Sequence, residues 1–351
     1  MMLAALAGCA GLGEPSAPGV RVTDTLPPLP QPVANNAVAT VDTPDGPALL
    51  SFLGLGEGRT WRDIHNRAYA LLPGADAWET LPDVPGPGRL AATAVAVGDR
   101  VILLGGYTVA EDGHEVSVPA VYEFDLAARV YASRADMPVP VDDAVSLVYR
   151  DRYVYLVSGW HDTGNVNLVQ VYDAVDDRWF QATPFPGRPV FGHAGALSAD
   201  TLVVCDGVGI RTTRGRRAFE AVRACYRGVI DAEQPARIDW TVLDHPPGPA
   251  RYRAAAATVG QDVWLIGGSD NPYNYNGIGY DGVPSAPIAD VAVLDLASGV
   301  WRREGTLDRP SMDHRGALPD GTGLVLVGGM LTDQQVTRTV RRLRIGGAAS
   351  P

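Results

Sequence analysis

Short apolar runs that end in small residues recur along the chain at intervals of roughly fifty residues. They are rich in valine, leucine and isoleucine and are too short for helices, so they predict buried β-strands. The runs are 101–106, 155–159, 202–207, 264–268 and 325–329, with a degenerate first copy at 50–54. This periodicity indicates a repeat protein built from small β units.

Each run lies within a unit of four expected strands. Another apolar segment precedes it across a tight turn, as 91–97 precedes 101–106. A variable loop, a third strand and a fourth strand with an aromatic residue follow it. The fourth-strand aromatics are Trp78, Tyr131, Trp179, Trp240 and Trp301. We expect each unit to be a four-stranded sheet whose aromatic residue packs against the neighbouring unit.

The last unit, 315–345, ends after its third strand. The segment 20–27 near the N-terminus resembles the fourth strand at 77–82, so we expect it to complete the last sheet. Such pairing closes the ring and removes an exposed sheet edge.

Paired glycines after the second strand and an aromatic residue on the fourth resemble the kelch repeat of β-propellers. The resemblance covers about residues 20–345 in six copies. It implies an all-β fold, a six-bladed kelch-type β-propeller with its last blade closed by the N-terminal strand. We expect a single propeller domain at 20–346 and a C-terminal tail at 347–351.

The amino-acid composition excludes several classes of function. All 29 basic residues are arginines, and the net charge is −11. Without lysine, Schiff-base catalysis and a phosphate-binding lysine are excluded. An acidic chain is also a poor candidate for binding nucleic acid. No apolar run reaches the ~18 residues expected of a membrane span.

Residues 1–19 read as a signal-like segment followed by a Gly/Pro/Ser tether. The sequence LAGC at 6–9 resembles a bacterial lipobox, in which Cys9 would carry a lipid anchor. The alternative is a frayed, alanine-rich N-terminus. Export to the periplasm or cell envelope is the expectation. Cys205 and Cys225 then form a disulfide or remain as two buried thiols.

In a propeller, the loops between strands 2 and 3 open on the same face as the segments that lead into strand 1. Here the 2–3 loops are long, and function concentrates on such loops. Alignment of the strand-1 starts places one polar residue per blade at the axial mouth. They are Asn36, Arg89, Asp143, His193, Arg253 and His314, with Arg315 beside the last. This ring predicts a site for a small anionic or polyhydroxylated ligand, whereas each residue alone could simply solvate the channel.

The loop 268–282 supplies Asp270, Asn271, Tyr273 and Tyr275, whose rings and amides suit a sugar. Its alternative is a packed turn cluster. Its spacing does not fit an EF-hand calcium loop, and we expect no metal and no cofactor. The arginine cluster at 211–217 is read as a solvated hairpin tip or as a contact for an anionic partner.

LPPLP at 26–30, NNAV at 35–38 and GLG at 54–56 resemble the bacterial N-acetylneuraminate epimerase family of sialic acid mutarotases. The resemblance implies anomer interconversion by general acid–base catalysis. In that reaction His193 or His314 would titrate. Asp143, Asp270 or Asp313 would act as base or orient an imidazole. Arg89 and Arg253 would hold a substrate carboxylate.

Two alternatives stand beside this function. Galactose oxidase also has a kelch propeller, but copper chemistry is disfavoured because the six histidines are scattered. A non-catalytic kelch module that binds a peptide or protein through the same face is the other alternative. An enzyme should bring a histidine and a carboxylate within hydrogen-bonding distance in a deep pocket. A binding module should instead have an open, shallow face and no strongly perturbed ionisable group.

Overall fold

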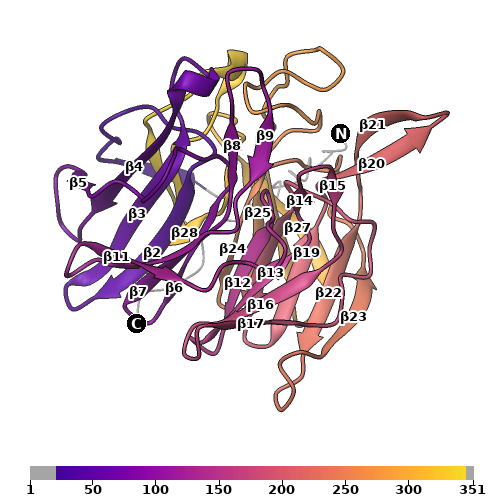
Figure 1. Cartoon of the computed structure of the whole chain (residues 1–351), viewed down its shortest axis with the longest axis horizontal. Coiled ribbons are helices and arrows are strands. Elements are labelled where there is room, and N and C mark those ends of the chain that lie inside the picture. Colours follow the sequence, from indigo (N-terminus) through magenta and orange to yellow (C-terminus); the bar gives the residue numbers. More distant parts are fainter. Residues whose placement is uncertain (1–20, 345–351) are drawn as a thin grey trace, which may run out of the picture.

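The computed structural model describes residues 21–344. Six four-stranded antiparallel sheets succeed one another around a common axis (Figure 1). Their innermost strands contact each other in the order β2, β6, β12, β18, β24 and β28, and β28 returns to β2. The protein is therefore a closed six-bladed β-propeller, as the repeat predicts. The lipobox-like segment with Cys9 and the C-terminal tail lie outside the described residues.

Within each blade, the strands are named here in order from the axis outward. Blade 1 contains β2 (Ala37–Thr43), β3 (Gly46–Leu55), β4 (Ile64–Leu71) and β5 (Glu79–Leu81). Blade 2 contains β6 (Thr93–Val97), β7 (Arg100–Leu104), β10 (Val121–Asp125) and β11 (Val130–Arg134). Blade 3 contains β12 (Val145–Tyr149), β13 (Tyr153–Val157), β16 (Val169–Asp173) and β17 (Arg178–Gln181).

The other three blades follow the same plan. Blade 4 contains β18 (Ala194–Ser198), β19 (Thr201–Cys205), β22 (Cys225–Ile230) and β23 (Ile238–Leu243). Blade 5 contains β24 (Ala255–Val259), β25 (Asp262–Ile266), β26 (Asp290–Asp295) and β27 (Val300–Thr306). Blade 6 contains β28 (Leu318–Pro319), β29 (Gly323–Val327), β30 (Val340–Arg344) and β1 (Arg21–Leu26).

Smaller elements decorate the connections between second and third strands. They are the hairpins β8 (Tyr107–Val109)/β9 (Glu115–Ser117), β14 (Trp160–His161)/β15 (Gly164–Asn165) and β20 (Val208–Thr213)/β21 (Arg216–Ala221), and the 3₁₀ turns η1 (Trp61–Asp63) and η2 (Thr332–Gln334).

The N-terminal strand closes the ring. β1 pairs antiparallel with β30, with Leu26 opposite Val340. The expectation that this segment supplies the missing fourth strand is confirmed. The two ends of the described chain thus share one sheet, and blade 6 has no unpaired third strand at its outer side.

The glycine at the end of each second strand is required by close approach of the next segment. Gly106 has a φ of +89°, and a Cβ there would lie 2.6 Å from the carbonyl oxygen of Leu90. The equivalent glycine of every other blade meets the corresponding carbonyl at 2.8–3.0 Å. No side chain fits at this distance, so the repeated glycine fixes how closely the strand-1 entrance packs.

The fourth-strand aromatics bond to the preceding blade. The indole N–H groups of Trp78, Trp179 and Trp301 donate to the carbonyl oxygens of Pro27, Ala135 and Asp244 at 2.7–2.8 Å. The hydroxyl of Tyr131 donates to Pro82 in the same way, at 2.9 Å. These side chains therefore join neighbouring blades by a directed bond as well as by packing.

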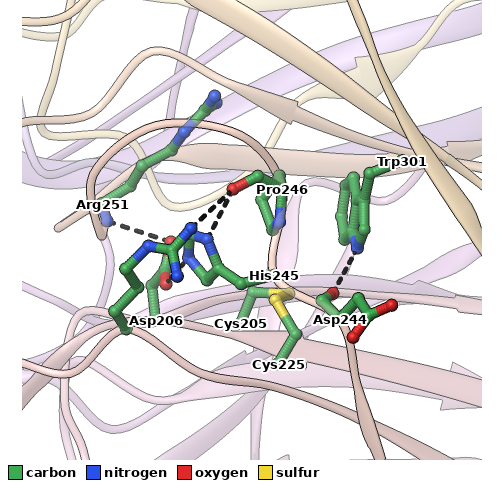
Figure 2. Close-up of a disulfide and its surroundings, with 9 residues drawn as sticks. Cys205, Asp206, Cys225, Asp244, His245, Pro246, Arg251 and Trp301 are labelled. Carbon is green, nitrogen blue, oxygen red and sulfur yellow. Dashed lines mark hydrogen bonds and ion pairs between the residues drawn. A yellow bond between two sulfur atoms is a disulfide. The ribbon is translucent and has the colours of Figure 1, made fainter.

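Cys205 and Cys225 face each other on β19 and β22 and form a disulfide (Figure 2). Beside it, Nε2 of His245 lies 2.5 Å from Oδ1 of Asp206. The other oxygen of Asp206 accepts a hydrogen bond from the backbone N–H of Arg251 at 3.0 Å. Of the two readings of these cysteines, the structure has the disulfide, and it lies next to a junction between blades 4 and 5.

Replacing both cysteines by alanine should lower the free energy of unfolding by about 3 kcal/mol, because the disulfide closes a loop in the unfolded chain. Urea unfolding under non-reducing conditions measures this change. Dithiothreitol should lower the midpoint of the wild type but leave that of the variant unmoved. Equal midpoints for both proteins without reductant would contradict a disulfide in solution.

Candidate functional site

The connections between second and third strands lie together on one end of the propeller, here called the long-loop face. They touch one another: the backbone N–H of Ser117 donates to Asp162 at 3.0 Å, and the side chain of Arg59 donates to the carbonyl of Asn276 at 2.9 Å. The rings of Phe219 and Tyr280 stack with centroids 4.1 Å apart. The opposite end, here called the tight-turn face, carries the short turns between first and second strands.

One residue per blade, just before strand 1, forms a ring around the axis. The six residues are Asn35, Ala91, Asp143, Gly192, Arg253 and Asp313, and all have φ between 50° and 67°. The backbone N–H of Asp143 donates to the carbonyl of Ala91 at 3.1 Å, that of Gly192 to Asp143 at 2.8 Å, and that of Arg253 to Gly192 at 2.8 Å. Asn35 donates to Asp313 at 3.1 Å and accepts the N–H of Ala91 on its side-chain oxygen.

The remaining junction uses the N–H of His314, which donates to the carbonyl of Arg253 at 3.2 Å. Inter-blade hydrogen bonds therefore encircle the axis completely. Five of the six residues with left-handed backbone are not glycine, a conformation that persists only where surrounding contacts enforce it. We call this the axial ring.

The axial ring corrects the expected register. Asp143 and Arg253 occupy the expected positions, but Asn36, His193 and His314 lie one residue beyond the ring. Arg89 lies two residues before Ala91. Each ring residue follows a residue that an isolated bridge joins to the end of the second strand or to the segment just after it, such as Leu90 with Tyr107 of β8. Residue types alone do not reveal that bridge, so alignment on the polar residues shifted four of the six blades.

Two aspartates and two arginines form a buried ion-pair cluster at the axis. The Nε and Nη2 of Arg253 donate to the two oxygens of Asp143 at 3.1 and 2.6 Å. Its Nη1 donates to Asp313 at 3.1 Å, and Arg315 donates to Asp143. None of the four side chains is more than 4% exposed. We call these four residues the axial cluster.

The charges of the axial cluster offset one another, since two carboxylates lie against two guanidinium groups. Burial alone would raise the pKa of Asp143, but the guanidinium groups of Arg253 and Arg315 outweigh it and hold that pKa below its usual value. Burial raises the pKa of Asp313, although the same arginines oppose the rise. Arg253 and Arg315, two of the arginines expected to contact a ligand, are therefore already bonded to aspartates.

The axial cluster separates two cavities. A channel of about 570 Å³ runs along the first strands, and its lining includes Arg315, His193 and His314 at one end and Asp42 and Gly321 at the other. Asp42, near the end of β2, and Gly321, in the turn after β28, are both exposed, so the channel opens on the tight-turn face.

The second cavity is a pocket of about 80 Å³ on the long-loop face. It is lined by Tyr107, Glu115, Asp142, Asp143, Trp160, Phe191, Phe219, Arg253, Asn274 and Tyr280. Asp143 and Arg253 thus form part of its floor, while Arg315 lines the channel behind them. The expected open mouth is in fact divided by a partition of paired charges.

Neither candidate histidine is hydrogen-bonded to a carboxylate. The Nε2 of His193 lies 3.0 Å from the carbonyl oxygen of Val157, and that of His314 lies 2.6 Å from the hydroxyl oxygen of Ser311. Burial lowers the pKa of His193 to about 4. Burial, with help from Arg341 and Arg315, lowers that of His314 to about 3. Both imidazoles are therefore neutral near pH 7.

Asn36 and Arg89 hold the scaffold. The side-chain amide of Asn36 donates to the hydroxyl of Ser51 at 2.8 Å. Arg89 donates to the carbonyl of Gly105 at 3.0 Å and lines neither axial cavity. The expectation that Arg89 reaches the axial opening is therefore wrong, because a backbone carbonyl within its own blade holds the guanidinium.

The loop 268–282 is partly packed against the axis. Tyr273 is fully buried, and the guanidinium carbon of Arg253 lies 5.4 Å from its ring centroid. Tyr275 is half-buried, and Asp270 is exposed. The side-chain amide of Asn271 donates to Asp281 at 3.3 Å. Tyr273 therefore presents no face to a ligand, and the aromatic ring that this loop contributes to the pocket is that of Tyr280.

Sequence reasoning missed several pocket residues. Burial raises the pKa of Glu115, and burial together with Asp143 raises that of Asp142 well above its usual value. The hydroxyl of Ser117 donates to Asp142 at 2.6 Å. The sequence did offer a signal for both acids, since Glu115 lies in a long 2–3 loop and Asp142 directly precedes the ring residue Asp143. No sequence signal pointed to the aromatic residues Trp160, Phe219 and Tyr280, because loops of different length cannot be aligned with one another.

Comparisons with known proteins agree with the fold. No protein-family model matches the chain. Kelch domain-containing protein 3 of Bos taurus is 27% identical over 52% of this chain and 49% of its own length. Kelch-like protein 15 of Gallus gallus is 29% identical over 43% of this chain and 30% of its own length. The chain thus spans half or less of the length of these two relatives.

The solved structure of YjhT has a TM-score of 0.72 at 15% identity and covers 92% of this chain and 98% of that chain. At this identity the likeness shows the fold alone. Together with the low-identity kelch relatives, it defines the protein as a six-bladed propeller of the kelch type.

Residues 21–344 contain neither a candidate membrane-spanning helix nor a candidate metal site. No helix in this part of the chain is long and apolar enough to cross a membrane. Within the same residues, no three histidine, cysteine or acidic side chains are grouped to hold a metal ion.

Replacing Arg253 by glutamine should destabilise the fold by about 3–5 kcal/mol, since it leaves two buried carboxylates short of a counter-charge. Arg303→Gln is the matched control, because Arg303 pairs with Asp290 on the surface and is 61% exposed. Chemical unfolding of both variants measures the difference. Equal stability of the two variants would contradict a structural role for the axial cluster.

Proposed function

We propose that this protein is a non-catalytic recognition module of the cell envelope that binds a peptide or protein partner through its long-loop face. The observation that carries the proposal is the axial cluster. Its arginines are neutralised by aspartates, and the histidines beyond it have no carboxylate partner. This arrangement offers a rigid base for a binding surface but lacks the histidine–carboxylate pair that acid–base catalysis would use.

The long-loop face has features of a binding surface. Phe219 and Tyr280 stack at the pocket rim, and Tyr280 remains 39% exposed. Aromatic residues of this kind commonly carry the largest share of binding energy in protein interfaces. The low-identity kelch relatives agree with the fold on which this face is built.

Export is part of the same proposal. The Cys205–Cys225 disulfide supports it, because such bonds persist in oxidising compartments such as the periplasm. The lipobox-like sequence at 6–9 supports a lipid anchor at Cys9.

Selection of a displayed peptide library against the whole protein tests the recognition function. Selected peptides should bind with at least tenfold lower affinity to Phe219→Ala and Tyr280→Ala, because the stacked pair is the aromatic anchor of the face. Val242→Ala, on the outer strand β23 and 77% exposed, is the control and should bind normally. If the selected peptides bind both aromatic variants as tightly as the wild type, the long-loop face is not the binding surface.

Sugar anomerisation is the second candidate, and the channel with His193, His314 and Arg315 is what favours it. Its size suits a small ligand, and the resemblance to sialic acid mutarotases implies this reaction. NMR exchange spectroscopy on sialic acid and common hexoses measures the rate. If the reaction occurs, His314→Ala should lower the rate at least a hundredfold. If the measured rate does not exceed the uncatalysed background, anomerisation is excluded for those sugars.

A further inference from the structure

Arg315 is buried and only partly satisfied. Its Nη1 donates to Asp143, whereas its Nε and Nη2 have no hydrogen-bond partner. These two nitrogens form one edge of the guanidinium, the edge that binds a carboxylate with two parallel bonds. Arg253 in the same cluster uses this edge to hold Asp143. The structure thus contains one filled and one unfilled copy of the same recognition geometry.

The unfilled edge belongs to a side chain at the inner end of the channel. His193, which also lines this end, has an Nδ1 atom without a partner. Buried polar atoms without partners are unfavourable, so the two Arg315 nitrogens favour an added acceptor. Because Nε2 of the neutral His193 ring donates to the Val157 carbonyl, its Nδ1 is an acceptor and favours an added donor such as a ligand hydroxyl group. His314 completes the inner end, and its Nε2 is already paired with Ser311.

We propose that the channel is a binding site for the carboxylate of a small, hydrophilic organic acid. The acid enters from the tight-turn face, and its carboxylate pairs with the Nε–Nη2 edge of Arg315. The site lies on the far side of the axial cluster from the long-loop face. It therefore does not depend on the partner binding proposed above. It uses the same channel as the second candidate, sugar anomerisation, but requires binding only and no turnover.

The walls of the channel indicate the rest of the ligand. The first strand of every blade is the inner edge of its sheet, and an edge strand presents backbone N–H and C=O groups that lack a neighbouring strand. Such a wall suits hydroxyl groups more than a long apolar tail. Asp143 and Asp313 lie in the same cluster as Arg315, so a singly charged carboxylate is favoured over a doubly charged phosphate.

The test is a titration of the full protein followed by NMR of its arginine Nε–H groups. Sodium acetate and sodium gluconate are the probes, acetamide is the neutral control, and inorganic phosphate is the competing anion. We expect one Nε–H signal to shift and saturate with each acid, and more tightly with gluconate. That signal should be absent in Arg315→Gln and present in the surface control Arg303→Gln. Acetamide should shift nothing.

A second variant keeps the arginine and obstructs the channel. Gly316 lines the channel, and a Cβ added there meets only the Ala256 oxygen at 3.9 Å and a Val38 methyl at 4.0 Å. Gly316→Leu should therefore fold and bind either acid at least tenfold more weakly. The proposal would be overturned by any of three results. These are unchanged binding by Gly316→Leu, a titration of the wild type that never saturates, and binding of phosphate but of neither acid.

Discussion

The structure depends on hydrogen bonds between blades around the axis. Each blade alone is a four-stranded sheet with two apolar faces, and it becomes stable only when neighbours cover both. The axial ring sets the spacing of the six sheets, and the glycine at the end of each second strand lets the next segment approach to contact distance. At the periphery, the indole and phenol bonds to the preceding blade repeat the same connection.

This ring also decides the electrostatics of the centre. It forces Asp143, Arg253 and Asp313 into left-handed backbone, so their side chains are brought together with that of Arg315. Buried charges are tolerated only when they are paired, and here two aspartates form ion pairs with two arginines. The result is a charged partition in a region that would otherwise be a continuous channel. It leaves an aromatic pocket at one end and a blind channel at the other.

The repeat made the fold predictable to a large degree. Glycine pairs, fourth-strand aromatics and the incomplete last unit each report a local requirement of the blade, so their spacing identified six sheets and the closing strand. The site was predictable only in part. Asp143 and Arg253 were placed correctly, while Asn36, His193 and His314 were displaced by one position and Arg89 by two. A shift of one residue in a strand reverses the side-chain direction, so small errors in register change which groups meet.

The sequence by itself determined the number of blades, their order and the way the ring closes, because these follow from turn residues and apolar periodicity that act locally. It also placed the cysteines on strands expected to be adjacent. Only the tertiary structure decided that they bond and that the axial arginines are already paired. Only it showed which face each cavity opens on. Those outcomes depend on contacts between residues more than a hundred positions apart, such as Asp143 with Arg253, whose distance is set by closure of the whole ring.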